Sequence, residues 1–512
     1  MSSQRACEYL NQEIPEGTGL QDVVQQAKDK WNSEVFNKVT TSDTNSDNLA
    51  LLYTSLYGMH LLPSNRTGDN PKWQSAEPSY DDIYTLWDLF RCTTALFHVI
   101  QPVAYEEMLR SMIDVWRNEG FLPDARSSNY NGRTQGGSNA DNVLADAYVK
   151  GVRGQINWED GYAAMQTDAE SVPPNNNDPN APDSSTKEGR GALPDWLELG
   201  WITPRFTRAV TRAVEYAAND FGLYQVASGL GRTEDAAKYL QRSRQWRNHW
   251  NPDVQSLNSS GFLVSRNADG SFIEQNPLLC GGCYWGDNYY QGKPWEYSMN
   301  AHHDIYHLIE LSGGNDGFVQ RLDTLMDPAN GIFNPGNQPS FTTPYLYNFA
   351  GRQDLSVQQV RRVGKNQYNA GAGGVPGASD AGSMQSWILW NMIGLYPITG
   401  QTTFLIGSPW FDDLTIKTPS GRDLRIRASG SNGGSNFYVQ SLQVNGESWN
   451  KNWVTWDDIF ANGGTLDFEL GPEPVRWDTG DLPPSPASVV QTASGKRGEL
   501  LGSPSVSGQT ET

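Results

Sequence analysis

The sequence predicts a mainly helical protein, in which paired helices form a toroid and a smaller β-rich segment follows. Two observations lead to this prediction. Apolar residues recur at helical spacing through the first 400 residues, and the period of the pattern changes to two from about residue 401. No strand pattern is evident between the helices. About a dozen such helices, joined by loops of varied length, suit a toroid whose open end is built from loops.

The helical pattern is clearest in two segments. LQDVVQQAKDKW, which begins at residue 20, and YEEMLRSMIDVW, which begins at residue 105, each place their apolar residues on one face at i, i+3 and i+4 spacing. Gly313 and Gly314 are suitable stop signals after a helix. Further helices are predicted near residues 47–62, 82–99, 140–152, 158–170, 203–229, 233–250, 296–312, 317–327, 355–368 and 383–394.

The last part of the chain changes character twice. LTIKTPSGRDLRIRA alternates apolar and polar residues around a Pro-Ser-Gly turn and predicts a hairpin, and FYVQSLQVNG and TLDFELG continue the alternation. We therefore expect a β-rich segment over residues 401–477. Residues 478–512 are rich in Pro, Ser, Gly and Thr and predict a disordered tail. Residues 171–187, SVPPNNNDPNAPDSSTK, predict an exposed loop.

The composition of the chain argues against some classes of binding partner. The formal net charge is −20, which argues against nucleic acids and anionic membrane surfaces. No stretch approaches the roughly 18 apolar residues of a membrane-spanning helix. The 18 tryptophans suit large cores between helices, and tryptophan is also a common platform for sugar rings. The N-terminus has no apolar signal core, so the chain is intracellular or its true N-terminus is missing.

The cysteines and the N-glycosylation sequons give weaker evidence about disulfides and secretion. Cys280 and Cys283 form a CGGC segment, which predicts a local disulfide or two inert thiols. Cys7 and Cys92 are isolated in the sequence. Two Asn-x-Ser/Thr sequons, at Asn65 and Asn258, are compatible with secretion.

Six short stretches carry polar side chains that helix or loop packing alone does not require. In chain order they contain Trp87 and Asp88; Asp141 and Asp146; Glu188 and Arg190; Glu296, His303 and Asp304; Asn337 and Gln338; and Asp380. Structural interpretations remain open: Asp88 can pair with Arg91 along a helix face, and His303 can be an ordinary half-buried histidine. Asp380 can simply cap the helix that follows it. The residues alone indicate an acidic, aromatic-rich helical enzyme or lectin, with carbohydrate as the favoured ligand.

Taken together, several stretches resemble glycoside hydrolase family 92, the calcium-dependent exo-α-mannosidases that invert anomeric configuration. They are WDLFR, ADAYVKG, PWEYSMNAHHD, PSFTTPYLYNFAGR and AGSMQSWILWNMIGLYPITGQTTFLIGSP. The resemblance implies an (α/α)6 toroid, here residues 20–400, preceded by a β-sandwich that packs on it. This chain starts at what resembles the linker between the two, so residues 1–19 are interpreted as its remnant. A mannose-containing glycan or glycoprotein is the implied partner, in a secreted or secretory-pathway protein, with a cytosolic location as the alternative.

The resemblance also implies roles for individual residues. Asp380 matches the general base, and Gln338 stands where the family has a general-acid Glu in a Gly-Asn-Glu-Pro loop. An inverting pair needs room for a water, so acid and base are expected about 6.5–9.5 Å apart. Ca²⁺ is the implied cofactor, with Glu296 and Asp380 as oxygen ligands. The implied substrate-binding residues are Trp87, Asp88, Trp295, His303 and Asn337.

Two residues depart from the family pattern. Gln338 cannot donate a catalytic proton, and Ser379 precedes Asp380 where relatives often have an acidic residue. A phosphate leaves without protonation, and an amide N–H can donate to it, so Gln338 suits the mannose-1-phosphate diesters that some relatives with this glutamine cleave. Two alternatives remain open. One is an ordinary α-1,2-mannosidase with a substitute acid, and the other is a catalytically inactive, lectin-like mannose-binding homologue.

Overall fold

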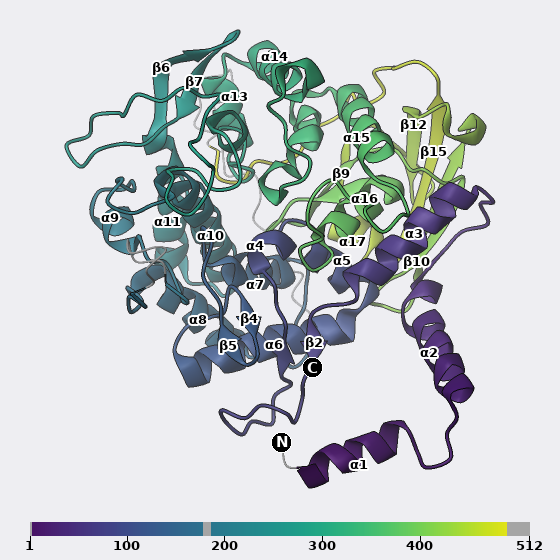
Figure 1. Ribbon diagram of the computed structural model, residues 1–512. Coiled ribbons are helices and arrows are strands. Elements are labelled where there is room, and N and C mark those ends of the chain that lie inside the picture. Colours follow the sequence, from purple (N-terminus) through teal and green to yellow (C-terminus); the bar gives the residue numbers. More distant parts are fainter. Residues whose placement is uncertain (1–2, 178–185, 489–512) are drawn as a thin grey trace, which may run out of the picture.

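The computed structural model describes residues 3–177 and 186–488, and it is helix-rich with most of its strands near the C-terminal end (Figure 1). The longer helices of the body are α3 (Ser46–Met59), α5 (Thr93–Ile100), α6 (Pro102–Glu119), α7 (Asn139–Val149), α8 (Trp158–Glu170), α10 (Ala209–Gly229), α11 (Thr233–Arg242), α14 (Asn315–Met326), α15 (Gln353–Gln367) and α16 (Ser383–Ile393). The predicted helix-rich class is confirmed.

The helices form an inner and an outer layer. Helices α5, α7, α10 and α16 are buried on nearly all sides, whereas α6, α11 and α15 bury one face only. Inner helix α10 contacts α7, α8 and α11, and inner helix α16 contacts α3, α5 and α15. A helix that is buried on nearly all sides needs neighbours all round, so these four lie in the core. Asp380 lies directly before α16, and α4 (Leu86–Leu89), which carries Trp87 and Asp88, precedes α5.

Two predicted helices are each divided into two in the structure. The segment near 82–99 is divided into α4 (Leu86–Leu89) and α5, and the segment near 296–312 into α12 (Pro294–Tyr297) and α13 (Ile305–Leu311). Asp304 lies at the second break, where its carboxylate accepts hydrogen bonds from the side chains of Trp246 (3.0 Å) and Arg247 (2.8 Å). These tertiary partners stabilise a backbone course that apolar periodicity does not reveal.

The expectation of no strands within the helical part is wrong. The predicted helix near 233–250 ends with α11 at Arg242, and an antiparallel hairpin follows, formed by β6 (Trp250–Ser256) and β7 (Ser259–Leu263). Figure 1 shows this hairpin reaching out at the edge of the helical body. Helix α9 (Leu193–Glu198) was also not anticipated. Both elements are short, and neither shows a sustained period in its sequence.

The predicted C-terminal hairpin is confirmed. Strands β10 (Asp413–Lys417) and β11 (Asp423–Ser429) pair antiparallel, with Leu414 opposite Ile426 and Ile416 opposite Leu424. They belong to a six-stranded sheet of order β1-β10-β11-β15-β12-β13. The other members are β1 (Val39–Thr40), β12 (Tyr438–Val444), β13 (Glu447–Trp449) and β15 (Gly464–Gly471). A second sheet contains β8 (Leu395–Pro397), β9 (Thr403–Ile406) and β14 (Trp453–Thr455), and α17 (Trp456–Ile459) follows it.

The first part of the predicted disordered tail is ordered. The backbone N–H of Ala487 donates to the carbonyl of His303 (2.9 Å), and the Ser488 hydroxyl donates to Asp304 (2.7 Å). Hydrogen bonds to the helical body therefore order residues 478–488 despite their polar composition. Residues 489–512 lie outside the described residues, as do 178–185 of the predicted loop. Residues 171–177 of that loop form no helix or strand.

The N-terminal segment forms two helices that extend away from the body (Figure 1). Helices α1 (Ser3–Glu13) and α2 (Leu20–Glu34) contain no buried residue. The helix predicted from residue 20 is confirmed, but much of its apolar face is open to solvent: Leu20 is 75% exposed, whereas Trp31 near the C-terminal end packs against Phe36 and Tyr57. An amphipathic helix gains its stability mainly from burying this face.

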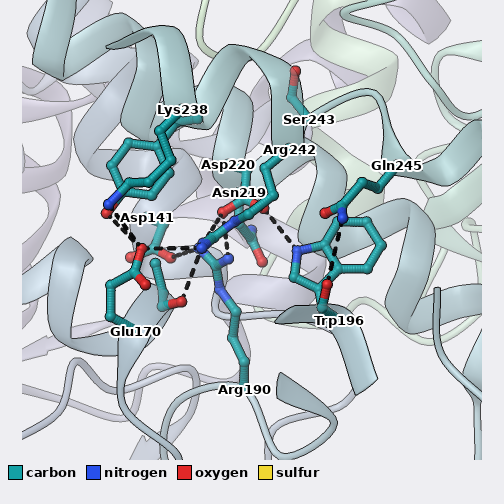
Figure 2. A network of polar contacts seen from close by, with 12 residues as sticks. Asp141, Glu170, Arg190, Trp196, Asn219, Asp220, Lys238, Arg242, Ser243 and Gln245 are labelled. Atoms are coloured by element: carbon teal, nitrogen blue, oxygen red, sulfur yellow. Dashed lines mark hydrogen bonds and ion pairs between the residues drawn. The ribbon is translucent and has the colours of Figure 1, made fainter. Parts of the chain in front are cut away.

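A buried charge network joins four segments of the helical body (Figure 2). The guanidinium of Arg190 lies between Asp141 (2.9 Å) and Asp220 (2.7 Å), and Arg242 also binds Asp220 (2.7 Å). Burial alone would raise the pKa of Asp220, but Arg242 and Arg190 outweigh it and lower that pKa to about 2. Asp141 and Arg190 therefore serve the packing of α7, α10 and α11 and not the candidate site.

Candidate active site

Asp380 lies in a tight turn directly before inner helix α16. Asp380, Ala381 and Gly382 have φ angles of 46°, 54° and 84°, so the backbone is left-handed at all three residues. A Cβ at position 382 would lie 2.3 Å from the Cα of Met59, which explains the glycine. The turn leaves the Asp380 side chain partly open to solvent, at the N-terminal end of a helix, where a carboxylate is electrostatically favoured.

Gln338 contacts Asp380 directly. Its Nε2 donates to Asp380 Oδ2 (2.6 Å) and to the hydroxyl of Ser383 (3.0 Å), and the side chain is fully buried. The Gln338 Oε1 atom is buried without a hydrogen-bond partner within the described part of the chain. This arrangement differs from the expected one, in which the residue at the acid position and the base lie apart with the sugar between them. Both amide hydrogens serve Asp380 and Ser383, so only the acceptor oxygen of Gln338 is left over.

Asp88 is the second carboxylate of the site. It belongs to α4, and its Oδ2 accepts a hydrogen bond from the hydroxyl of Thr85 (2.8 Å), which itself accepts one from Gln135 (2.7 Å). Asp88 Oδ1 has no partner among the described residues. The expected pairing with Arg91 is not a hydrogen bond, because Arg91 binds Glu215 (3.0 Å).

The two carboxylates differ in their affinity for a proton. Burial raises the pKa of Asp88 well above its usual range, and the charge of Asp380 raises it further. The pKa of Asp380 is also raised by burial, but the hydrogen bond from Gln338 opposes this shift. Burial therefore favours the protonated form of Asp88, whereas the hydrogen bond from Gln338 favours the ionised form of Asp380.

Trp87 and Asn337 join this site through Gln291. The Trp87 indole donates to Gln291 Oε1 (2.8 Å), and the Asn337 amide donates to the Gln291 backbone carbonyl (3.2 Å). The loop that carries Gln291 contains the disulfide between Cys280 and Cys283, so the first of the two expectations for this cysteine pair is confirmed.

Gln291, Thr85 and Ser383 were missed by the sequence analysis. Ser383 lies three residues after Asp380, and a search for side chains near the base could have included it. Thr85 and Gln291 carry no comparable signal. Each acts through one hydrogen bond to a residue that the sequence did identify.

Glu296 is a buried carboxylate with a structural role. Its Oε2 accepts from the backbone N–H of Lys293 (2.8 Å), and its Oε1 accepts from the backbone of Asn334 (3.1 Å) and the hydroxyl of Ser340 (2.6 Å). It thereby caps α12 and fixes the loop that carries Gln338. These bonds do not fit the expected Ca²⁺ site of Glu296 with Asp380. Within residues 3–177 and 186–488, no group of three or more His, Cys, Asp and Glu side chains is placed to hold a metal ion.

Two of the predicted substrate-binding residues lie away from Asp88 and Asp380. The Trp295 indole is fully buried, donates to the hydroxyl of Ser256 (3.0 Å) and packs against Phe262, so it belongs to the packing of the β6–β7 hairpin. The His303 ring bonds the carbonyl of Ser243 (2.8 Å) and stacks on Phe221 (5.2 Å). The structure therefore brings together Trp87, Asp88, Asn337, Gln338 and Asp380, and assigns structural contacts to Trp295, His303 and Glu296.

Two carboxylates within electrostatic range of each other, here Asp88 and Asp380, are typical of a glycoside hydrolase. The model of the glycosyl hydrolase family 92 catalytic domain matches residues 5–472. The chain belongs to this family, and the resemblance seen in the sequence is confirmed.

Similar proteins agree with this assignment. An uncharacterized secreted glycosidase of Arthroderma benhamiae (strain ATCC MYA-4681 / CBS 112371) is 33% identical over 513 residues, which cover 95% of this chain and 61% of the relative. The chain thus spans about three fifths of that protein. Within the described ranges, no helix is both long and apolar enough to cross a membrane.

Solved structures share the fold. A family 92 inverting mannosidase of Bacteroides thetaiotaomicron superposes with a TM-score of 0.83 at 24% identity, over 93% of this chain and 66% of that one. An α-mannosidase of the same organism, in complex with mannoimidazole, also gives 0.83 at 24% identity, over 94% and 64% of the two chains.

Proposed function

We propose that the chain hydrolyses terminal α-mannosyl linkages of glycans or glycoproteins with inversion, and that Asp380 activates the attacking water. The observation that carries this proposal is the position of Asp380 in a turn partly open to solvent, where the hydrogen bond from Gln338 favours the ionised form that a general base needs. The mannosidase titles of the solved relatives support mannose as the sugar. We also propose that the two helix layers form the family's (α/α)6 toroid, and that the protein enters the secretory pathway like its curated relative.

We further propose that the leaving group is a phosphate, as in mannose-1-phosphate diesters. A general acid accelerates departure of an alcohol by about 10²–10⁴-fold, whereas phosphate leaves as a stable anion. Position 338 holds a neutral amide, so this residue adds no negative charge to that of Asp380 to repel a phosphate. The phosphate proposal therefore rests on the lack of an acid at position 338. It does not rest on a hydrogen bond from the amide N–H to phosphate, because both amide hydrogens already bind Asp380 and Ser383.

A second candidate is an ordinary α-mannosidase in which Asp88 replaces the missing acid. Its raised pKa and the free Oδ1 atom favour this alternative. In this case the proton moves from Asp88 to the glycosidic oxygen as the C1–O bond breaks, and Asp380 takes a proton from the attacking water. A proton transfer from Asp380 to Asp88 then restores the starting state.

The test is turnover of two substrates by the whole chain. We expect cleavage of mannose-1-phospho-6-mannose that exceeds cleavage of α-1,2-mannobiose, with Asp380→Asn as the inactive control. Cleavage of mannobiose alone would favour Asp88 as the acid and contradict the phosphate proposal. If wild type cleaves neither substrate but binds mannose, the lectin-like alternative is correct.

Calcium remains a proposal, with ligands other than Glu296. Ca²⁺ prefers hard oxygen ligands, and the oxygens without hydrogen-bond partners at the site are Asp88 Oδ1 and Gln338 Oε1, beside the carboxylate of Asp380. When bound, the ion would supply positive charge to orient sugar hydroxyl groups.

Chelation tests the calcium proposal without measuring turnover. A ligand that binds only the native state raises its stability, so EDTA should lower the melting temperature and added Ca²⁺ should restore it. Asp88→Asn should reduce this difference, whereas Asp413→Asn, in the C-terminal sheet, should retain it. An unchanged melting temperature in both steps would remove calcium from the proposal.

A further inference from the structure

Two exposed tyrosines lie beside the candidate site without an assigned role. Tyr84 is 60% exposed and Tyr284 is 62% exposed. We propose that Tyr84 and Tyr284 form a platform that binds the sugars on the leaving-group side of the scissile bond. This inference deepens the proposed function and rests on it.

Both tyrosines connect to the site through one intermediate residue. Tyr84 directly precedes Thr85, whose hydroxyl donates to Asp88. The Tyr284 ring lies 6.1 Å from the ring of Tyr290, and the Tyr290 ring lies 5.7 Å from that of Trp87. The hydroxyl of Tyr290 is within electrostatic range of Tyr84, Tyr284 and Asp88. A chain of aromatic rings therefore runs from buried Trp87 through Tyr290 to exposed Tyr284.

The loop that carries Tyr284 is held rigidly. The disulfide between Cys280 and Cys283 closes it on one side. On the other side, the Asp287 carboxylate accepts from the backbone N–H of Gly282 (3.0 Å) and of Tyr284 (2.9 Å). The Asp287 carbonyl accepts from the backbone of Arg208 at the start of α10. A preorganised loop loses little entropy when a ligand binds, so its exposed ring is suited to recognition.

Trp285 anchors the loop that carries Tyr284. Its ring packs against Tyr290 at 5.1 Å, and the guanidinium of Arg208 lies 4.6 Å from its centre. Trp285 is half-buried, in contrast to Tyr284. The indole therefore anchors the loop, while the neighbouring phenol faces solvent.

Other exposed tyrosines have structural partners of their own. The ring of Tyr57 lies 4.7 Å from that of Trp31, and Lys72 lies 4.7 Å above Tyr130. Within the described residues, neither an aromatic ring nor a cation stacks on Tyr84. Tyrosine offers a large, rigid, amphipathic surface, which suits the alternating C–H and hydroxyl groups of a sugar ring.

The test compares leaving groups of different size. One substrate is α-mannosyl fluoride, whose leaving group is a single atom. The other is an oligosaccharide with at least two sugars on the leaving side, joined by whichever linkage the wild type cleaves. Tyr84→Ala and Tyr284→Ala should each raise KM for the oligosaccharide about tenfold and leave kcat/KM for the fluoride unchanged. Phe437→Ala, at a half-buried ring beside the C-terminal sheet, is the matched control and should change neither value.

The outcomes separate this inference from the proposed function. Equal kinetics of the tyrosine variants and Phe437→Ala on both substrates would overturn the platform and leave the hydrolase activity established. If wild type cleaves neither substrate, calorimetric titration with α-mannotriose decides. If only the tyrosine variants bind mannotriose more weakly, the platform is supported in a protein without hydrolase activity. Unchanged binding would overturn both the platform and the proposed hydrolase function.

Discussion

At the scale of single residues, the short contact between Gln338 and Asp380 organises the site. The amide donates a hydrogen bond to the half-buried carboxylate and so favours its ionised form, and the hydroxyl of Ser383 accepts a second hydrogen bond from the amide. Glutamine here therefore does more than mark the loss of an acid. It is a neutral partner that the base requires in this arrangement.

Asp380→Asn should remove turnover on both types of linkage. Either leaving group needs the same activated water, and loss of a general base costs about 10²–10⁴-fold in kcat. Asparagine tolerates the left-handed backbone of this turn, so the melting temperature should stay close to that of wild type. Measurement of kcat together with thermal unfolding checks both parts. Retained turnover would show that another group activates the water.

Gln338→Glu should change the pH dependence of the reaction. Two carboxylates at hydrogen-bond distance cannot both ionise easily, so the already raised pKa of Asp380 should rise further. Activity needs ionised Asp380, and the acid limb of the kcat/KM profile should therefore move to higher pH.

The same substitution should alter the choice of linkage. The new carboxyl group can donate a proton, so the rate of glycosidic cleavage should rise at pH values above the acid limb of the profile. Charge repulsion should impair phosphodiester cleavage. Ser383→Ala is the control, because it removes the other partner of the amide without adding charge. A profile that coincides with that of wild type on both substrates would contradict the role given to this contact.

At the scale of elements, buried charges join inner helices α7 and α10 to outer helix α11, and the sequence presents two of these residues, Asp141 and Arg190, as possible site residues. Asp141 on α7, Asp220 on α10 and Arg242 on α11 converge on Arg190 or on each other (Figure 2). Such a network gives little net stability compared with apolar packing, but each member depends on the others. The same holds for Glu296, which joins α12 to the loop of Gln338.

Arg190→Met should destabilise the fold strongly. It leaves two buried carboxylates without their shared partner, a change that costs about 3–5 kcal/mol in comparable buried pairs. Arg352→Met removes an exposed pair with Asp354 and should cost at most about 1 kcal/mol. Urea unfolding monitored by circular dichroism measures both free energies. Similar losses for the two variants would argue against the network as a structural centre.

At the scale of the whole molecule, the helical body and the C-terminal sheet pack together, whereas α1 and α2 extend into solvent (Figure 1). Leu10 and Ile14 near the first helix, and Leu20 and Val24 on the second, are exposed. Apolar side chains gathered on an extended segment promote association.

The chain should therefore self-associate as its concentration rises. Replacing Leu20 and Val24 with Glu adds charge to the apolar face of α2 and should shift the population towards monomer. Light scattering coupled to size-exclusion chromatography measures this change, with Gln25→Glu on the same helix as a control for added charge. A wild type that is monomeric throughout would contradict the prediction.

The sequence by itself determined the features that depend on near neighbours. Apolar periodicity predicted most of the helix-rich body, and alternation around a Pro-Ser-Gly turn predicted the hairpin of β10 and β11. The motifs of the family were also readable, because they are contiguous segments. Short elements such as the β6–β7 hairpin were not predicted, because a few residues carry too little periodicity.

Tertiary structure decided which candidate residues meet. Gln338 and Asp380 are 42 residues apart in sequence, and only the packing of their loops places the amide on the carboxylate. The motif that suggests Glu296 as a ligand cannot show that three hydrogen bonds already occupy its oxygens. The polar residues after 477 are ordered by contacts with distant segments, such as those of Ser488 with Asp304 and of Asp478 with Asn452. Partners, burial and proton affinity depend on distances between segments, which local sequence does not contain.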